Sequence, residues 1–365
     1  MRAEEAAAVF SGERLRLARF RAGLTLREVA ERVDVSHVAV SQYENDRNRP
    51  TPAVLARLAM ATGVTAGFFA FSQRRPVSQG GLDGTHFRSL RSTTRQGRAQ
   101  AWGWSEVVLD VAEVLERYVR LPDPHVPLLP LSPAFTENEL IKTARELRSA
   151  WALPDGPIGH LVRHMEAQGI LVARLEIANK GIDAFSHAQG ARPVVILGSD
   201  KGDVARSRFD AAHEVGHLVC HPDADPGGEQ EQQAHAFAAE LLMPRAYFVQ
   251  LLPTRFDLGA YARLKQEWGV SIAALLYRAR TLGVITDAAY RRAVVAMNKR
   301  YGRRSEPYPL QRPELPTLLA TACQVAQQEG VSREQIASEA CLPLEDLDAI
   351  VGNPDPRPLV RIERD

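Results

Sequence analysis

The sequence has few cysteines and no long apolar run. Its three cysteines, Cys220, Cys323 and Cys341, are an odd number at wide spacing, without a Cys-x-x-Cys pair. They predict no disulfide framework, and Cys220 is expected to be a small buried apolar residue, the alternative being a ligand or redox sensor. The opening residues form no signal peptide, and no apolar stretch reaches membrane-spanning length. We therefore expect a protein of the reducing cytoplasm with no membrane partner.

Lysine is absent from the first 100 residues, which carry 16 Arg against nine Asp or Glu. The formal charge of that stretch is +7, and the remainder of the chain carries −6, since the total is +1. This asymmetry indicates nucleic-acid contact at the amino end, because the field that matters is local to one domain. The length of 365 residues fits two to four domains, and 45% hydrophobic content is ample for packed cores.

Residues 12–72 have the pattern of five short helices. Thr25 and Glu28 form a capping box, and Ser36 can cap the helix that follows. Ala30 is small where two helices must cross closely. The segment resembles the helix-turn-helix domains of XRE and lambdoid-repressor type, with residues 36–44 as the recognition helix.

That resemblance implies double-stranded DNA as a partner. The first residues of a recognition helix face base edges in the major groove, while neighbouring side chains contact phosphates. The base-contact candidates are His37, Val38 and Gln42, of which Gln42 can pair with adenine. The candidates facing the DNA backbone are Arg27, Ser36, Asn45, Arg47 and Arg49. A symmetric operator would require a homodimer, and the alternative is a compact helical domain that binds only protein.

The most informative run is His213-Glu214-Val215-Gly216-His217. On a helix, residues four apart lie on one face, so the two imidazoles can share one metal ion. The glutamate between them can reach a metal-bound water. The run therefore contains two of the ligands and the general base of a zinc hydrolase.

A zinc hydrolase needs a third protein ligand, and four downstream residues are candidates. His221 continues the series but lies two turns from His213. Asp223 stands where some zinc proteases place a ligand after a Gly turn, yet that Gly position is Cys220 here. Glu231 opens a second helical pattern after a loop, and Glu229 lies close to it.

The two segments HEVGHLVCH and EQQAHAFAAELLMP together resemble the ImmA/IrrE-type metallopeptidases. The resemblance implies His213, His217 and Glu231 as zinc ligands and Glu214 as general base. His235 is a departure, because the family usually has Asn there, and we interpret it as a residue that orients a ligand or itself approaches the metal.

The implied reaction is amide hydrolysis. Zinc lowers the pKa of its bound water and polarises a peptide carbonyl, while Glu214 takes the water proton and passes it to the leaving amine. Tyr247, His221 and His235 are all near in sequence as candidates for oxyanion stabilisation, and the sequence does not choose among them.

The predicted fold is mostly α with a small β-sheet, an α+β class. Strands are expected at residues 169–175, 181–186 and 193–197, beside the zinc helix, and an exposed edge strand could bind an extended peptide. Residues 102–118, 136–151 and 159–168 have helical patterns. The expected domains are a helix-turn-helix head at 1–72, a basic linker and connecting helix at 73–135, a zincin-like peptidase core at 136–250, a helical extension at 251–312, and a helical unit at 313–365.

The unit at residues 313–365 mimics a helix-turn-helix in spacing. Its second helix carries Glu345, Asp346 and Asp348, which phosphates would repel. We therefore expect a scaffold or dimerisation unit. Trp268 and Tyr277, on the helices that follow the peptidase core, are expected to be core and lid residues rather than ligands.

Two functions compete. In the first, the protein is a regulatory zinc protease that cleaves a transcriptional repressor or related partner, placed at the promoter by its own DNA-binding head. In the second, it is a DNA-binding regulator whose peptidase fold serves as a sensor or oligomerisation body with little turnover. The full set of His213, Glu214, His217 and Glu231 favours catalysis, and the family resemblance implies a role in transcription regulation such as a stress response.

Overall fold

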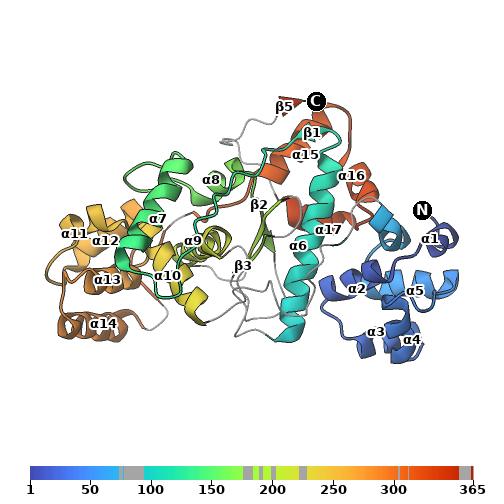
Figure 1. Ribbon diagram of the computed structural model, residues 1–365, viewed down its shortest axis with the longest axis horizontal. Coiled ribbons are helices and arrows are strands. Elements are labelled where there is room, and N and C mark those ends of the chain that lie inside the picture. Colours follow the sequence, from blue (N-terminus) through green and yellow to red (C-terminus); the bar gives the residue numbers. More distant parts are fainter. Residues whose placement is uncertain are drawn as a thin grey trace.

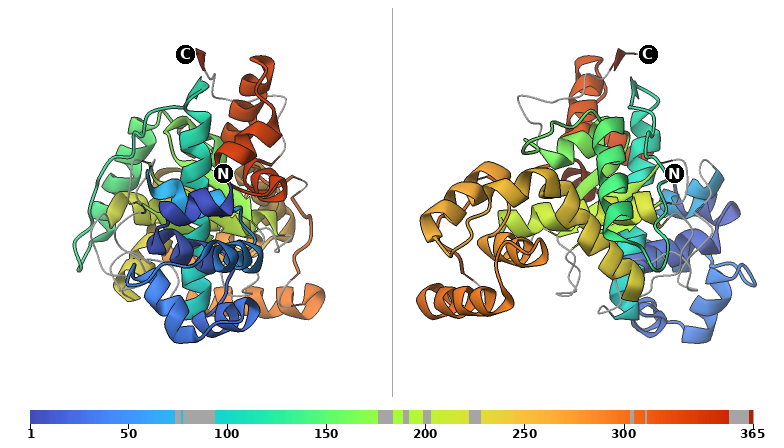
Figure 2. Two further views of the ribbon diagram at one scale, coloured as in Figure 1. Left: turned by 90° about the vertical axis from the view of Figure 1, so that its right-hand side faces the viewer. Right: turned by 60° about the vertical axis from the view of Figure 1, so that its left-hand side comes forward.

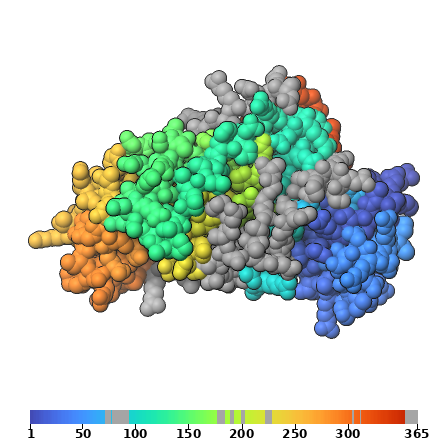
Figure 3. Space-filling model, viewed as in Figure 1, coloured from blue at the N-terminus to red at the C-terminus, as the bar shows by residue number. Residues whose placement is uncertain are grey.

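The computed structural model describes residues 1–73, 77, 94–175, 184–188, 192–198, 203–221, 228–302, 305–310, 312–352 and 363–364. The molecule is elongated, with the amino-terminal head at one end and the helices of residues 245–301 at the other (Figures 1 and 3). It is mostly helical around one small three-stranded sheet, which confirms the predicted α+β class. In the described part of the chain, every helix is too short or too polar to cross a membrane.

The head contains the five short helices predicted for residues 12–72, preceded by one more. They are α1 (Ala3–Ala8), α2 (Gly12–Arg21), α3 (Leu26–Val33), α4 (His37–Glu44), α5 (Pro52–Thr62) and the 3-10 helix η1 (Ala66–Gln73). The predicted capping box is present, since the Thr25 hydroxyl accepts from the Glu28 amide at 3.2 Å and the Glu28 carboxylate accepts from the Thr25 amide at 2.7 Å. Ser36 caps α4 as expected, accepting from the Ala39 amide at 3.1 Å.

Helix α6 (Arg95–Leu115) joins the head to the rest of the protein. It was expected at residues 102–118, but it begins seven residues earlier, at Arg95, because the Thr94 hydroxyl accepts from the Gly97 amide at 3.1 Å. Residues 74–76 and 78–93 of the predicted basic linker, including Arg88 and Arg91, lie outside the described residues. Most of α6 is buried, so it is a central element of the core rather than a connector.

The head packs directly on α6. Gly103 lets the two backbones approach closely, since a Cβ there would lie 2.5 Å from the Arg21 amide nitrogen. Nearby, the guanidinium of Arg14 donates to the Asp110 carboxylate at 2.5 and 3.1 Å, and both side chains are fully buried. The head and α6 therefore share one hydrophobic core.

The sheet has the strand order β2 (Leu171–Leu175), β4 (Val194–Gly198) and β3 (Ala184–His187). β4 is parallel to β2 and antiparallel to β3, so β2 and β3 are the edges. Because side chains alternate along a strand, Ile196 faces the core shared with α6 and the head, while Val195 and Leu197 face the second core. The first three residues of the strand predicted at 181–186 lie outside the described part.

The second core contains the remaining helices of the middle of the chain. These are α7 (Glu137–Ala150), α8 (Leu161–Ala167), α9 (Val204–Cys220), α10 (Gly228–Leu242), α11 (Arg245–Leu251), α12 (Leu258–Trp268), α13 (Ile272–Thr281) and α14 (Asp287–Tyr301). Helices α7 and α8 match the patterns predicted at 136–151 and 159–168. Helices α11 to α14 stand out from the sheet as a separate helical lobe (Figure 2). Trp268 is buried there against Phe248, with ring centroids 4.5 Å apart.

The carboxyl-terminal unit consists of α15 (Leu318–Gln328), α16 (Arg333–Glu339) and α17 (Leu344–Val351), and a short strand β1 (Val119–Arg120) pairs with β5 (Glu363–Arg364). The unit packs against α6 and β2 (Figure 1). Asp346 of α17 forms an ion pair with Arg21 of the head. The buried Glu166 carboxylate accepts from the Thr317 and Leu318 amides at the start of α15. These contacts make the unit an internal scaffold.

Candidate metal centre and DNA-binding head

Helix α9 carries the His-Glu-x-x-His run. It begins after Asp203, whose carboxylate accepts from the Arg206 amide at 3.1 Å. Residues four apart on a helix share one face, so Phe209, His213, His217 and His221 form a single row. The His217 side chain is fully buried and that of His213 is 16% exposed, so the row opens to solvent at its amino-terminal end.

Gly216 brings α10 close to α9. A Cβ at this position would lie 3.0 Å from Cδ1 of Phe237 and 3.2 Å from Cα of Ala234. A Cβ at these distances would require the neighbouring atoms to move by a few tenths of an ångström, and Ala234 itself is fully buried at the crossing. The close crossing places Glu231, in the first turn of α10, opposite the histidines of α9.

Three of the predicted residues converge on one point. The Nε2 atoms of His213 and His217 are 3.0 Å apart, and the Glu231 carboxylate oxygens lie 3.3 Å from His213 Nε2 and 3.4 Å from His217 Nε2. Two ligand atoms of a tetrahedral zinc ion, each about 2.1 Å from it, are separated by about 3.4 Å. The spacing, and the donor set of two imidazoles and one carboxylate, therefore fit zinc.

A hydrogen-bonded chain orients His217. Its Nδ1 lies 3.2 Å from Nδ1 of His221, whose Nε2 lies 2.6 Å from Oε1 of Gln233. The Gln233 amide nitrogen donates to the Ser132 carbonyl at 2.8 Å. The direction of this last bond sets the others, because the Gln233 oxygen must accept from His221 Nε2–H, and His221 Nδ1 must then accept from His217 Nδ1–H. This arrangement leaves the lone pair of His217 Nε2 directed at His213 and Glu231, as a metal ligand requires.

Burial and mutual contacts shift the pKa values of the three residues in the cluster. Burial lowers the pKa of His217 to about 4, despite the nearby Glu231 carboxylate. For Glu231, burial raises the pKa, but the neighbouring His213 and His217 outweigh it and bring the value to about 2. Burial also lowers the pKa of His213, yet its hydrogen bond to Glu231 and the charge of Glu214 raise it overall. The cluster thus holds a carboxylate anion beside a neutral imidazole at neutral pH.

Glu214 is buried next to the cluster. Its side chain is only 1% exposed, and its charge acts on His213. A carboxylate with little access to solvent and close to a ligand is suited to proton transfer.

The other predicted site residues lie in different places. Glu229 is exposed and outside the three-residue cluster, and Asp223 lies outside the described residues. His235 is exposed one turn beyond Glu231, with its ring 4.9 Å from that of Phe209. Tyr247 is exposed on α11 and outside the three-residue cluster. Cys220 is buried, which raises its thiol pKa to about 12, so it is not a reactive thiol.

Sequence reasoning missed Gln233 and Ser132. Gln233 lies two residues after Glu231, which is not a helical spacing that marks a shared face. Ser132 contributes its backbone carbonyl from a segment 101 residues away, and no side-chain pattern signals such a contact.

The outer face of α4 is open. His37, Val38 and Gln42 are exposed, whereas Val40 and Tyr43 are buried on the inner face. The structure therefore places the three predicted base-contact residues together on one accessible surface. Ser36, Arg27, Asn45, Arg47 and Arg49 are also exposed around this helix.

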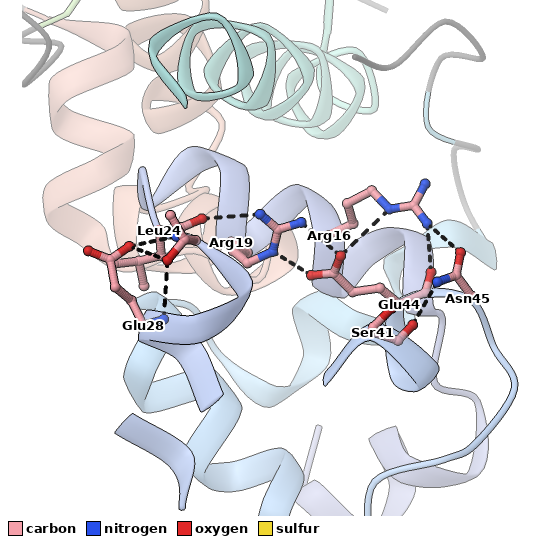
Figure 4. A network of polar contacts seen from close by, with 8 residues as sticks. Arg16, Arg19, Leu24, Glu28, Ser41, Glu44 and Asn45 are labelled. Carbon is pink, nitrogen blue, oxygen red and sulfur yellow. Dashed lines mark hydrogen bonds and ion pairs between the residues drawn. The ribbon is translucent and has the colours of Figure 1, made fainter. Parts of the chain in front are cut away.

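Two arginines of α2 fix the carboxyl-terminal end of α4 (Figure 4). Arg19 donates to both carboxylate oxygens of Glu44, at 2.6 and 2.8 Å, and to the Leu24 carbonyl at 3.1 Å. Arg16 donates to the Glu44 carbonyl and to the Asn45 side-chain oxygen. These contacts, of which the Arg19–Glu44 pair is buried, hold α4 in a fixed orientation, as a recognition helix needs. They also engage the Asn45 side chain within the head.

The fold and the two sites define a protein that joins a DNA-binding helix-turn-helix head to a peptidase-like body. Residues 12–67 match the family described as a helix-turn-helix domain, and residues 165–280 match the peptidase family described as the IrrE N-terminal-like domain. The second match runs from α8 to α13 and includes all three residues of the cluster. The predicted fusion is therefore confirmed, and the chain is a DNA-binding regulator with an IrrE-like domain. No curated protein matches the chain.

Proposed function

We propose that the protein is a regulatory zinc metalloprotease that cleaves a transcriptional repressor or related protein partner. The observation that carries the proposal is the convergence of His213, His217 and Glu231 at the spacing of a tetrahedral site. These residues would hold the ion, and the buried Glu214 stands beside them. The helix-turn-helix head supports a regulatory rather than a digestive role, because it would place the protease at particular DNA sites.

Zinc bound in this site would polarise a peptide carbonyl and activate a water molecule. The chain's own groups have separate tasks. Glu214 takes the proton of the attacking water and returns it to the leaving amine. His221 and Gln233 hold His217 in the tautomer that can ligate, and they are shielded from solvent with it.

The test is a comparison of wild type with Glu214→Gln, which removes the base and leaves all three ligands in place. Both zinc-loaded proteins are incubated with the proteome of the host cell, and newly formed amino termini are identified by mass spectrometry. We expect specific new termini with wild type, none with Glu214→Gln, and none with wild type after chelation. Equal cleavage by Glu214→Gln, at equal zinc content, would show that the assignment is wrong.

The alternative is a DNA-binding regulator whose body acts as a sensor. The shared core of the head and α6 supports it, because a change in the body would reach the head through the buried Arg14–Asp110 pair. In that case, metal loading would change operator affinity without any new amino termini. The same zinc-loaded and chelated samples, tested by DNA binding, separate the two functions.

A further inference from the structure

A row of aromatic rings leads away from the candidate metal centre. Phe209 lies one turn before His213 on α9, and His235 one turn after Glu231 on α10, with ring centroids 4.9 Å apart. The row continues from His235 to Tyr277 of α13 at 6.3 Å, and from Tyr277 to Tyr290 of α14 at 6.4 Å. The first two rings are therefore carried by the two helices that supply the proposed ligands.

The aromatic row does not form the core of the helical lobe. That core is built by Phe248, Trp268 and Tyr261, all of which are buried. Tyr277, in contrast, is 43% exposed although it sits between two other rings. An exposed aromatic surface that is continuous with a reactive site can take up an apolar group, which would exclude water from both.

The charge next to the row is balanced. The Arg280 guanidinium lies over the rings of Tyr277 and Tyr290, at 5.8 and 5.3 Å from their centroids. Its Nε is also 2.5 Å from the Asp287 carboxylate. Because this cation is already neutralised, the row favours an uncharged occupant over a carboxylate.

We propose that Phe209, His235 and Tyr277 form the substrate subsite for a large apolar or aromatic side chain, adjacent to the scissile bond. The inference rests on the proposed function, since it needs a metal at His213, His217 and Glu231. It adds the substrate class, a peptide with a bulky apolar residue beside the cleaved bond, and it assigns the specificity to rings on three different helices.

The test uses two hydroxamates, which bind zinc through the same group and differ only in their side chain. Acetohydroxamic acid has a methyl group, and 3-phenylpropanohydroxamic acid has a phenyl group on a short linker. Binding is measured by calorimetry on zinc-loaded protein whose metal content is determined in the same sample. Wild type should bind the phenyl compound about tenfold or more tightly than the methyl compound.

The variant Tyr277→Ala should lose most of this preference while binding acetohydroxamic acid as wild type does. Its matched control is Tyr308→Ala, the same change at a tyrosine that is 54% exposed and not in the row, which should keep the preference. Equal affinity for the two compounds in zinc-loaded wild type, or an unchanged preference in Tyr277→Ala, would overturn the subsite alone. Wild type that holds no zinc would overturn the proposed function and the subsite with it.

Discussion

Replacing Gln233 by leucine should weaken zinc binding without removing any ligand. The Gln233 oxygen accepts from His221, which in turn orients His217. With leucine, the buried His221 Nε2–H loses the Gln233 acceptor, at a cost of about 1–3 kcal/mol. The alternative tautomer of His221 would place its Nδ1–H against that of His217, 3.2 Å away. Both changes at His221 destabilise the His217 tautomer whose Nε2 can bind the metal.

Losing a residue that orients a metal ligand typically costs about 10–100-fold in metal affinity, which is about 1.4–2.7 kcal/mol. The zinc dissociation constant is measured by competition with a chromophoric chelator at pH 7.5, and thermal unfolding confirms that each variant folds. Gln232→Leu is the matched control, because Gln232 is the exposed neighbour on the same helix. Gln233→Glu keeps an acceptor oxygen for His221 but loses the donor to the Ser132 carbonyl, so it should retain more of the wild-type affinity than Gln233→Leu. Unchanged affinity in a folded Gln233→Leu protein would refute the hydrogen-bonded chain as a determinant of the site.

Four further predictions concern the fold and the head. Gly216→Ala should destabilise the protein by about 1–3 kcal/mol because its Cβ would lie 3.0 Å from a neighbouring ring, whereas Gly159→Ala, with no atom within 4 Å, should have little effect in the same denaturant titration. Asp110→Ala should cost about 3–5 kcal/mol, since it leaves a buried guanidinium without its carboxylate; a smaller loss would mean that the pair does not anchor the head. Burial raises the pKa of Glu166 from 4.5 to about 7, so the folded state retains a proton that the unfolded chain releases. The free energy of unfolding should therefore fall as pH rises from about 4.5 to about 7, and a pH series on Glu166→Gln should show a shallower slope. Gln42→Ala should weaken binding to the preferred DNA site by about 1–3 kcal/mol with little change at unrelated sites, and uniform weakening would move Gln42 from base contact to phosphate contact.

The local features of the fold were predictable from the sequence. The capping box of Thr25 and Glu28 and the cap at Ser36 depend on residues three apart, and the structure has them as expected. The short apolar runs bounded by turn residues likewise placed β2 and β4 within two residues. The register of His213 and His217 followed from helical geometry alone.

Contacts between distant parts of the chain were not predictable. Arg14 and Asp110 are 96 residues apart, so no spacing rule connects them. Helix α6 was predicted to be a connecting helix, whereas the structure buries it against the head. The start of α6 was missed because Arg95 and Arg98 were assigned to a basic linker, although Thr94 caps the helix. At the candidate metal centre, residue spacing alone left four possible third ligands, and the crossing of α9 and α10 at Gly216 is what brings Glu231 to the histidines.

The most direct test of the proposed metal centre is the zinc content of purified protein after removal of loosely bound ions. Wild type is compared with His217→Ala, with Glu231→Ala, and with Glu229→Ala, the matched change at an exposed glutamate two residues away. We predict about one zinc per chain in wild type and in Glu229→Ala, and loss of zinc in the other two variants. Wild type without zinc, or zinc retained in Glu231→Ala, would contradict the assignment.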